Sequence, residues 1–195
     1  HDDLTRLPNR MHFEEALQAQ FAKAQQEEHA ISVLFVDLDD FKPINDSLGH
    51  AVGDQVLIEV GQRLKAALRQ EDTVARLGGD EFVLLISSVS DEKQVIDIVE
   101  RLLPALARPY CIDGHELYLT ASVGIAISGP TTHQTQSLIQ QADMAMYKAK
   151  QQGRNAYAWF SNDINELASE PVILRNDLQE AIDHQRAFDR RHRAP

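Results

Sequence analysis

The chain has 195 residues, of which 43% are hydrophobic and 25% are charged, and its formal net charge is -11. This composition suits one globular domain with a sizeable core. The acidic balance disfavours a nonspecific nucleic-acid binder or an anionic-membrane binder, because both need a concentrated basic surface. The single cysteine, Cys111, excludes an intrachain disulfide and favours a reducing compartment. No apolar run reaches the roughly 20 residues that span a bilayer, so we expect a cytoplasmic domain with no nucleic-acid partner and no direct membrane contact.

Hydrophobic periodicity predicts the order of the helices and strands. We expect a helix over residues 9–28, a strand over 31–36, a short helix over 41–48, a helix over 51–69, strands over 73–77 and 81–86, a helix over 91–107, strands over 110–112 and 117–127, a helix over 136–152 and a strand over 156–160. Residues 31–36 are nearly all apolar, which indicates a central strand buried on both faces. Alternation within residues 117–127 predicts a strand with one buried face. Tight turns at Gly78-Gly79-Asp80 and Asp113-Gly114 predict two hairpins.

These elements predict an α+β fold with a mixed, largely antiparallel central sheet flanked by helices. We expect this domain to span residues 1–160. Residues 161–185 have the apolar spacing of a further helix, and residues 190–195 are polar and basic. We therefore expect residues 161–195 to be a helical linker with a disordered end. Because the chain begins abruptly at His1, we expect it to be part of a longer protein, which could be tethered to a membrane elsewhere.

Acidic residues collect at the ends of two predicted strands. Asp37 ends the buried strand, and Glu81 directly follows the Gly78-Gly79-Asp80 turn. If the two strands are neighbours, their carboxylates converge at one edge of the sheet and repel one another unless a cation neutralises them. Carboxylates and a backbone carbonyl suit Mg²⁺, a hard ion that prefers oxygen ligands and substrate phosphates. The alternative is that acidic residues simply decorate loops, but the whole pattern favours a metal site.

Glycines and basic residues near this edge favour a phosphate ligand. The Gly78-Gly79 turn lacks side chains, so phosphates or a sugar could approach its backbone closely, although an ordinary hairpin turn has the same sequence. Lys42 follows the acidic strand end, and Lys150 and Arg154 are four residues apart near a helix end and share one face. Taken alone, such a pair is more often part of a solvated surface.

Four ordered motifs resemble the GGDEF family of diguanylate cyclases. Residues 76–82, Arg-Leu-Gly-Gly-Asp-Glu-Phe, match the signature that names the family. Residues 1–10, 35–54 and 142–155 resemble its opening motif, its metal-binding and guanine-binding segment and its closing helix. The resemblance covers about residues 1–160, and it implies a fold similar to nucleotide cyclases and polymerase palm domains.

The resemblance also implies roles for the residues at matching positions. These are the metal ligands Asp37, Leu38 (through its carbonyl) and Glu81, the catalytic residues Asp80, Glu81 and Lys42, the substrate-binding residues Leu4, Phe41, Lys42, Asn45, Asp54, Lys150 and Arg154, and the inhibitory product site Arg69 and Asp72. The metal would be Mg²⁺ or Mn²⁺, with two ions per active site. Asn45 and Asp54 would hydrogen-bond the guanine edge, which would explain a preference for GTP over ATP.

The implied activity is the condensation of two GTP molecules into cyclic di-GMP and two pyrophosphates. The 3′-hydroxyl of one GTP would attack the α-phosphate of another with metal assistance. Because the product has two such bonds, a second copy of the domain would have to face the first in antiparallel fashion. Residues 174–178 resemble the lead-in to an EAL phosphodiesterase domain, so we expect a C-terminal EAL domain in the parent protein.

Three alternatives to an active cyclase are compatible with the motifs. The domain could be a non-catalytic GTP-binding regulator of an attached EAL phosphodiesterase, a product-binding receptor that uses Arg69 and Asp72, or a different nucleotide cyclase or palm enzyme. The intact acidic residues favour the active cyclase. One position departs from the family pattern, because Arg6 stands where glycine is usual. If that position needs a positive φ, arginine would cost stability or reshape the rim of the pocket.

Overall fold

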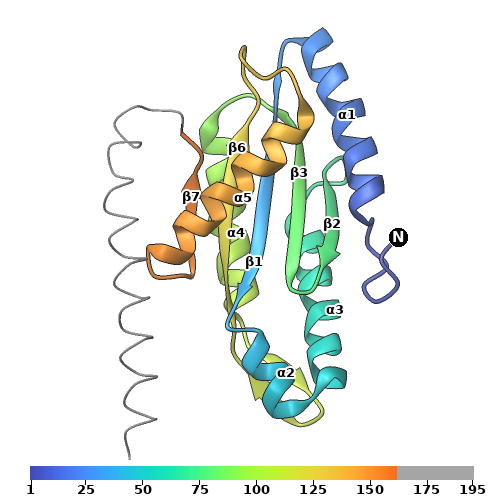
Figure 1. The fold of residues 1–195 in the computed structure, drawn as a ribbon, viewed down its shortest axis with the longest axis vertical. Helices are drawn as coiled ribbons and strands as arrows, with labels where there is room; N and C mark the ends of the chain where they lie inside the picture. The colour runs from blue at the N-terminus through green and yellow to red at the C-terminus, as the bar shows by residue number, and fades with distance from the viewer. Residues whose placement is uncertain (162–195) are drawn as a thin grey trace, which may run out of the picture. The chain divides into compact units, whose positions relative to one another are not determined.

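The computed structural model of the chain describes residues 1–161. The described helices are α1 (Arg10–Glu27), α2 (Lys42–Leu48), α3 (His50–Ala67), α4 (Glu92–Ala107) and α5 (Thr135–Gln151), and the strands are β1 (Ala30–Asp39), β2 (Thr73–Gly78), β3 (Glu81–Val89), β4 (Tyr110–Ile112), β5 (His115–Leu117), β6 (Thr120–Ile127) and β7 (Ala156–Trp159) (Figure 1). Apart from Ser161, the linker helix and the basic end that we expect within residues 161–195 lie outside the described residues. None of the described helices is long and apolar enough to cross a membrane.

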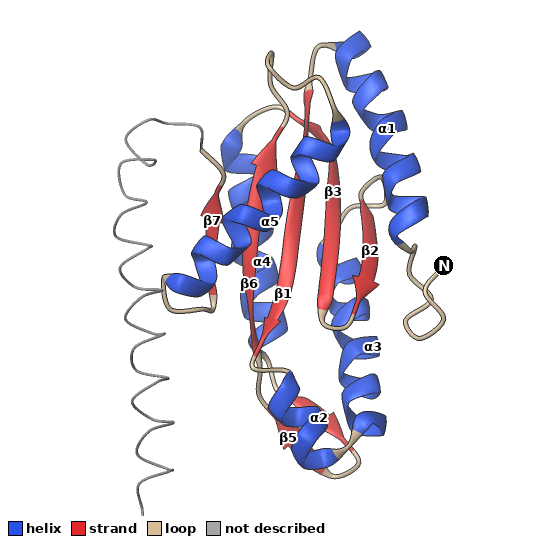
Figure 2. Ribbon diagram, in the orientation of Figure 1, coloured by secondary structure: helices blue, strands red, loops and turns tan. Residues whose placement is uncertain are grey.

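Five strands form the central sheet in the order β2-β3-β1-β6-β7 (Figure 2). The pairs β2–β3, β3–β1 and β1–β6 are antiparallel, whereas β6 and β7 are parallel. This confirms the predicted α+β fold with a mixed, largely antiparallel sheet. The central position of β1 follows from its sequence, because a strand that is apolar on both faces must be covered on both.

Helices cover both faces of this sheet, as Figure 1 shows for α5 in front and α4 behind. Alternate residues of β1 contribute to the two separate cores. Leu34 and Val36 pack with the apolar stripes of α3 and α4, whereas Val33 and Phe35 pack with α1 and α5. Asp37 lies two residues beyond Phe35, so its side chain belongs to the face that α1 and α5 cover.

Polar caps set the starts of two of these helices. The Asn9 side chain accepts a hydrogen bond from the backbone N–H of His12 at the start of α1. Asp91 does the same for Gln94 at the start of α4. Such caps satisfy backbone donors that the first helical turn leaves free.

The structure corrects three details of the predicted strands. β1 continues to Asp39 rather than ending at Asp37, because its pairing with β6 extends to Asp39, whereas its pairing with β3 stops at Asp37. The predicted strand over residues 117–127 is divided, since His115–Leu117 pairs with β4 in a separate two-stranded sheet and only Thr120–Ile127 joins the central sheet. β6 is buried on both faces rather than one. Its small residues allow this, because α5 crosses so close to Gly124 that a Cβ there would overlap the backbone of Ala142 and Met146.

Candidate active site

Two carboxylates lie opposite each other at one end of the β1–β3 pair. Asp37 and Glu81 are register partners in the antiparallel ladder, which places their side chains on the same face of the sheet. The β2–β3 turn is held against β1 by a hydrogen bond from the Leu38 backbone N–H to the Asp80 carbonyl at 3.3 Å. The structure therefore brings together the strand ends that sequence reasoning had only supposed to be neighbours.

The turn itself depends on glycine and on Arg76. Gly78 and Gly79 have φ values of 143° and 49°, which glycine adopts at little cost. The Arg76 guanidinium donates to the Gly79 carbonyl at 3.1 and 2.9 Å and to the Asp2 carboxylate at 3.0 Å. Arg76 thus joins the β2–β3 turn to the N-terminal turn. Sequence reasoning assigned it no role, although it stands inside the family signature.

Asp37 has an unusual electrostatic environment. Its Oδ1 is buried and has no hydrogen-bond partner among the described residues. Burial raises the pKa of Asp37 to about 6, and the nearby charges of Asp80 and Glu81 add to this effect while Lys150 opposes it. The pKa of Glu81 is also raised, first by burial and then by Asp143 and Asp80. Without a cation, the site therefore holds its negative charge under repulsion.

Lys150, from the last turn of α5, supplies part of the missing positive charge. Its ammonium lies 3.3 Å from Asp37 Oδ2 and 3.5 Å from Asp39 Oδ1, and it donates to the Leu38 carbonyl at 3.4 Å. Arg154 lies just beyond, in the exposed turn between α5 and β7. The predicted phosphate-binding pair is therefore brought to the same end of the sheet as Asp37.

The donor atoms around Asp37 fit a hard divalent cation. Asp37, Glu81 and the Leu38 carbonyl offer only oxygen, and one Asp37 oxygen has no protein partner. Such a set suits Mg²⁺, which takes one or two carboxylates and completes its coordination with water and substrate phosphates. Within residues 1–161, no group of three or more His, Cys, Asp or Glu side chains is arranged around a common metal position. The protein donors alone would therefore leave most of the coordination sphere to water and substrate.

The predicted guanine-binding residues lie on α2 and α3, which pack together. Asn45 is on α2 and the exposed Asp54 is near the start of α3. The amide of Asn45 lies directly over Gly53, where a Cβ would overlap its Oδ1. Leu4 and the buried Phe41 both contact the core on the α3 and α4 side. Gly53 was not singled out by sequence reasoning, because a glycine inside a helix gives no sign of what approaches it.

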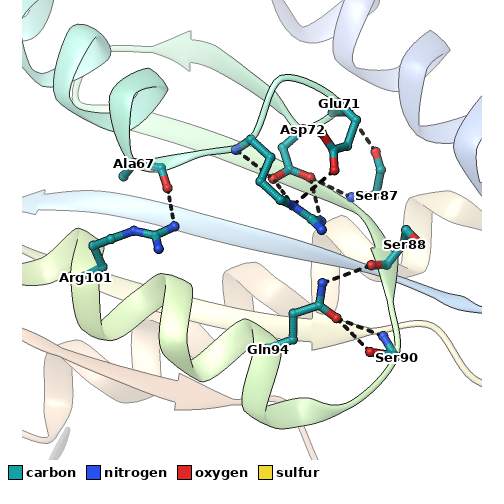
Figure 3. A network of polar contacts seen from close by, with 9 residues as sticks. Ala67, Glu71, Asp72, Ser87, Ser88, Ser90, Gln94 and Arg101 are labelled. Carbon is teal, nitrogen blue, oxygen red and sulfur yellow. Dashed lines mark hydrogen bonds and ion pairs between the residues drawn. The ribbon is translucent and has the colours of Figure 1, made fainter.

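Lys42 and the predicted product site complete the set. Lys42 is exposed at the first position of α2. Arg69 and Asp72 lie between α3 and β2, where Arg69 donates to Asp72 through two side-chain nitrogens, each at 3.2 Å. The Asp72 side chain is fully buried and also accepts from the backbone N–H of Ser87 at 3.0 Å (Figure 3). Arg69 keeps about a third of its side chain exposed, so it is the accessible member of the pair.

Comparison with known proteins identifies the family of the chain. The family described as diguanylate cyclase, GGDEF domain, matches residues 1–156. The bifunctional diguanylate cyclase/cyclic di-GMP phosphodiesterase MucR of Pseudomonas aeruginosa is 44% identical over 186 residues, which are 94% of this chain and 27% of MucR. The diguanylate cyclase TpbB of the same species is 40% identical over 180 residues, which are 92% of this chain and 40% of TpbB. The chain thus spans less than half the length of either relative.

Solved structures share the fold. The crystal structure of the TpbB GGDEF domain has a TM-score of 0.79 and 37% identity, and the match covers 82% of this chain and 99% of that one. The GGDEF domain of DgcB from Caulobacter crescentus, solved in complex with cyclic di-GMP, has a TM-score of 0.76 and 29% identity, covering 83% and 93% of the two chains. The chain belongs to the GGDEF-domain family of diguanylate cyclases.

Proposed function

We propose that this domain is a diguanylate cyclase, which condenses two GTP molecules into cyclic di-GMP and two pyrophosphates. The observation that carries the proposal is the pairing of Asp37 with Glu81 across β1 and β3, with one Asp37 oxygen left without a protein partner. A carboxylate pair that is costly to the free domain is typical of a functional site. Membership of the family, and relatives named as diguanylate cyclases, support the reaction class.

The acidic edge, which consists of Asp37, Asp80 and Glu81 at one end of β1 and β3, would lie beside the reacting hydroxyl and the α-phosphate. Asp37, Glu81 and the Leu38 carbonyl would hold two Mg²⁺ or Mn²⁺ ions, which would lower the pKa of the attacking hydroxyl and offset phosphate charge. The 3′-oxygen forms a bond to the α-phosphorus, the bond to pyrophosphate breaks, and the hydroxyl proton is lost. Asp80, which the Leu38 amide holds by its backbone, would stand beside the reacting ribose.

The remaining residues would bind and orient GTP. Lys42, Lys150, Arg154 and the backbone amides near Phe41 would hold the β- and γ-phosphates. The guanine edge would meet Asn45 and Asp54, with Leu4 against the base. The packing of Asn45 over Gly53 supports this arrangement, because it holds the amide at the junction of α2 and α3.

One domain would bind one GTP, which is only one of the two substrate molecules that the reaction joins. We propose that a second copy of the domain faces the first in antiparallel fashion, so that each 3′-hydroxyl meets the α-phosphate of the other GTP. Arg69 would bind cyclic di-GMP as an inhibitor, and Asp72, which is buried against it, would hold its guanidinium in place. The DgcB complex with cyclic di-GMP supports product binding within the family.

A second candidate is a GTP-binding regulatory domain attached to an EAL phosphodiesterase. The bifunctional name of MucR supports an attached phosphodiesterase. A non-catalytic role is favoured by NbdA of Pseudomonas aeruginosa, which is named a cyclic di-GMP phosphodiesterase only and is 36% identical to this chain over 182 residues. Either role requires GTP, so we propose that the domain works on the cytoplasmic side.

Incubation of concentrated protein with GTP and Mg²⁺, followed by chromatography of the products, tests the proposal. Glu81→Ala removes a carboxylate of the acidic edge, whereas Glu15→Ala removes an exposed one on α1 and serves as the matched control. We expect cyclic di-GMP from the wild type and from Glu15→Ala, and at least about a hundredfold less from Glu81→Ala. If the wild type makes no product even after forced dimerisation but binds GTP in the presence of Mg²⁺, the regulatory role replaces the cyclase.

A further inference from the structure

Asp39 is a buried carboxylate on which three elements converge. It is the last residue of β1, and only 2% of its side chain is exposed. It accepts hydrogen bonds from Thr120 Oγ1 at 2.6 Å, Ser122 Oγ at 2.7 Å and the backbone N–H of Asn155 at 2.9 Å. Lys150 adds an ion pair at 3.5 Å. These partners come from β6, from the α5–β7 turn and from α5. Asp39 therefore connects the end of β1 with all three of these elements.

The bond to Asn155 fixes a turn that is not favourable by itself. Arg154 and Asn155 have φ values of 64° and 45°, in the left-handed region that residues other than glycine rarely adopt. Such residues persist where the surroundings hold them. Asp39 helps to hold this turn, because its carboxylate accepts the hydrogen bond from the backbone N–H of Asn155, the residue next to Arg154. Backbone bonds also hold the turn, among them the bond from the Arg154 N–H to the Ala149 carbonyl and the bond from the Gly153 N–H to the Lys150 carbonyl, each at 3.3 Å.

The second connection, to Lys150, matters when the site is loaded. The ammonium has three acceptors, namely the carboxylates of Asp37 and Asp39 and the carbonyl of Leu38. Asp37 and Leu38 are the oxygen donors proposed for the metal. A cation bound to them would compete directly with Lys150 for both. Asp39 would then be the acceptor that keeps Lys150 at this edge, because its own remaining contacts are made with neutral hydroxyl and amide donors.

We propose that Asp39 is a positioning residue, which holds Lys150 and the Arg154 turn where the β- and γ-phosphates of GTP bind. The inference rests on the proposed phosphate-binding role of these two residues. Asp39 does not touch substrate and has no part in bond making. Neutralising it would therefore weaken the binding of the triphosphate while leaving the binding of the guanosine monophosphate part unchanged.

A double-mutant cycle with a substrate analogue tests this connection. The probe is 3′-deoxy-GTP with Mg²⁺, which lacks the attacking hydroxyl, and its dissociation constant is measured by calorimetry alongside that of GMP. We expect Asp39→Asn and Lys150→Met each to weaken 3′-deoxy-GTP binding about tenfold, the size of one lost charge-assisted hydrogen bond, with GMP affinity unchanged. The double variant should lose less affinity than the product of the two single losses, because Asp39 acts partly through Lys150. Any loss beyond that of Lys150→Met alone reports the second connection, from Asp39 to the Arg154 turn.

Controls separate positioning from a general loss of stability. Val99→Ala, a truncation in the buried face of α4, lowers the unfolding midpoint but should leave both affinities unchanged. If Asp39→Asn does not fold, Thr120→Val removes the shortest hydrogen bond to Asp39 while keeping the carboxylate. It should weaken 3′-deoxy-GTP binding about two- to threefold, consistent with one neutral hydrogen bond.

The outcomes are distinguishable. If Lys150→Met binds 3′-deoxy-GTP as tightly as the wild type, the proposed phosphate role of Lys150 is wrong and the inference falls with it. If Lys150→Met weakens binding but Asp39→Asn does not, only the positioning role of Asp39 is overturned. Equal losses of GMP and 3′-deoxy-GTP affinity in Asp39→Asn would also overturn it, since they would indicate a general distortion.

Discussion

Replacing Asp37 by asparagine should make the metal-free domain more stable while removing a ligand of the proposed metal site. The Asp37 carboxylate is held at a cost, because burial and the charges of Asp80 and Glu81 oppose its ionisation. One of its oxygens has no partner within the described residues. Asparagine keeps the size of the side chain and an acceptor for Lys150, but it carries no charge to desolvate.

The magnitude follows from the raised pKa. A rise from 3.8 to about 6 corresponds to about 3 kcal/mol at about 1.4 kcal/mol per unit. Solvent at the rim and the loss of a charged partner for Lys150 reduce this, so we expect a gain of about 1–2 kcal/mol near pH 7.5. Because folding raises the pKa of Asp37, the protonated carboxyl favours the folded state. This contribution to stability is fully present below pH 3.8 and is lost as the pH rises through about 6, where the carboxyl ionises in the folded domain. The advantage of Asp37→Asn should therefore be small near pH 4 and complete above pH 7.

Thermal unfolding in the presence of EDTA, measured between pH 4 and pH 8, checks this expectation. A domain of this size should show a gain of roughly 2–6 °C in Tm at pH 7.5. Asp97→Asn, which removes an exposed charge on α4, is the matched control and should show no such pH-dependent gain. Added Mg²⁺ should raise the Tm of the wild type and not that of Asp37→Asn. A variant that is less stable than the wild type at pH 7.5, or equally stabilised at pH 4.5 and 7.5, would refute the reasoning.

Three further substitutions test the backbone and the packing around the site. Arg6 has a φ of 63°, so Arg6→Gly should relieve backbone strain and raise the free energy of unfolding by about 0.5 kcal/mol in urea titrations. This value is the difference between the penalty of a left-handed non-glycine residue and the chain entropy of glycine. A loss of stability would contradict the expectation. Gly53→Ala should displace the Asn45 amide and press slightly on the Phe41 ring. We expect it to weaken 3′-deoxy-GTP binding about tenfold at a stability cost of about 1 kcal/mol, since the main movement is at the end of a flexible side chain. Unchanged binding would argue against Asn45 as a guanine ligand. Gly124→Ala should lower the free energy of unfolding by about 2 kcal/mol or more, because the new methyl group would meet the backbone of α5. A urea midpoint within error of the wild type would contradict this and would show that α5 can shift freely.

Local signals accounted for most of the elements, whereas long-range contacts did not follow from them. Periodicity placed the helices, and the observed caps Asn9 and Asp91 are the first residues of two of the predicted ranges. The apolar run before Asp37 placed the central strand. The division after residue 117 was missed, because alternation continues through the break and only pairing with β4 and β1 separates the two parts. The burial of both faces of β6 was missed because small residues were read as exposed, although Gly124 is small where a helix backbone passes over it.

The site shows the same division between local and distant information. The carboxylates of Asp37 and Glu81 could be placed from strand ends and turn chemistry. The link from Arg76 to Asp2 spans 74 residues, and no local pattern indicates it. Arg6 is the informative intermediate case, because its conflict with the family's usual glycine predicted a positive φ only as a condition, and the structure meets that condition.

The proposed binding of a triphosphate by a strongly acidic chain depends on how the charges of the site are balanced. Asp37 and Glu81 repel one another across β1 and β3, and the ligand-free domain offsets part of this charge with Lys150. The offset is incomplete, because the Asp37 Oδ1 faces no donor in the described residues. A cation that arrives with GTP would supply that missing partner and would also compete for the Lys150 contacts with Asp37 and Leu38. Lys150 would then be available to the phosphates, and Asp39, satisfied by neutral donors from β6 and the α5–β7 turn, would keep it there. On this reasoning metal and triphosphate binding should be mutually reinforcing, since each removes an electrostatic cost that the other alone would leave.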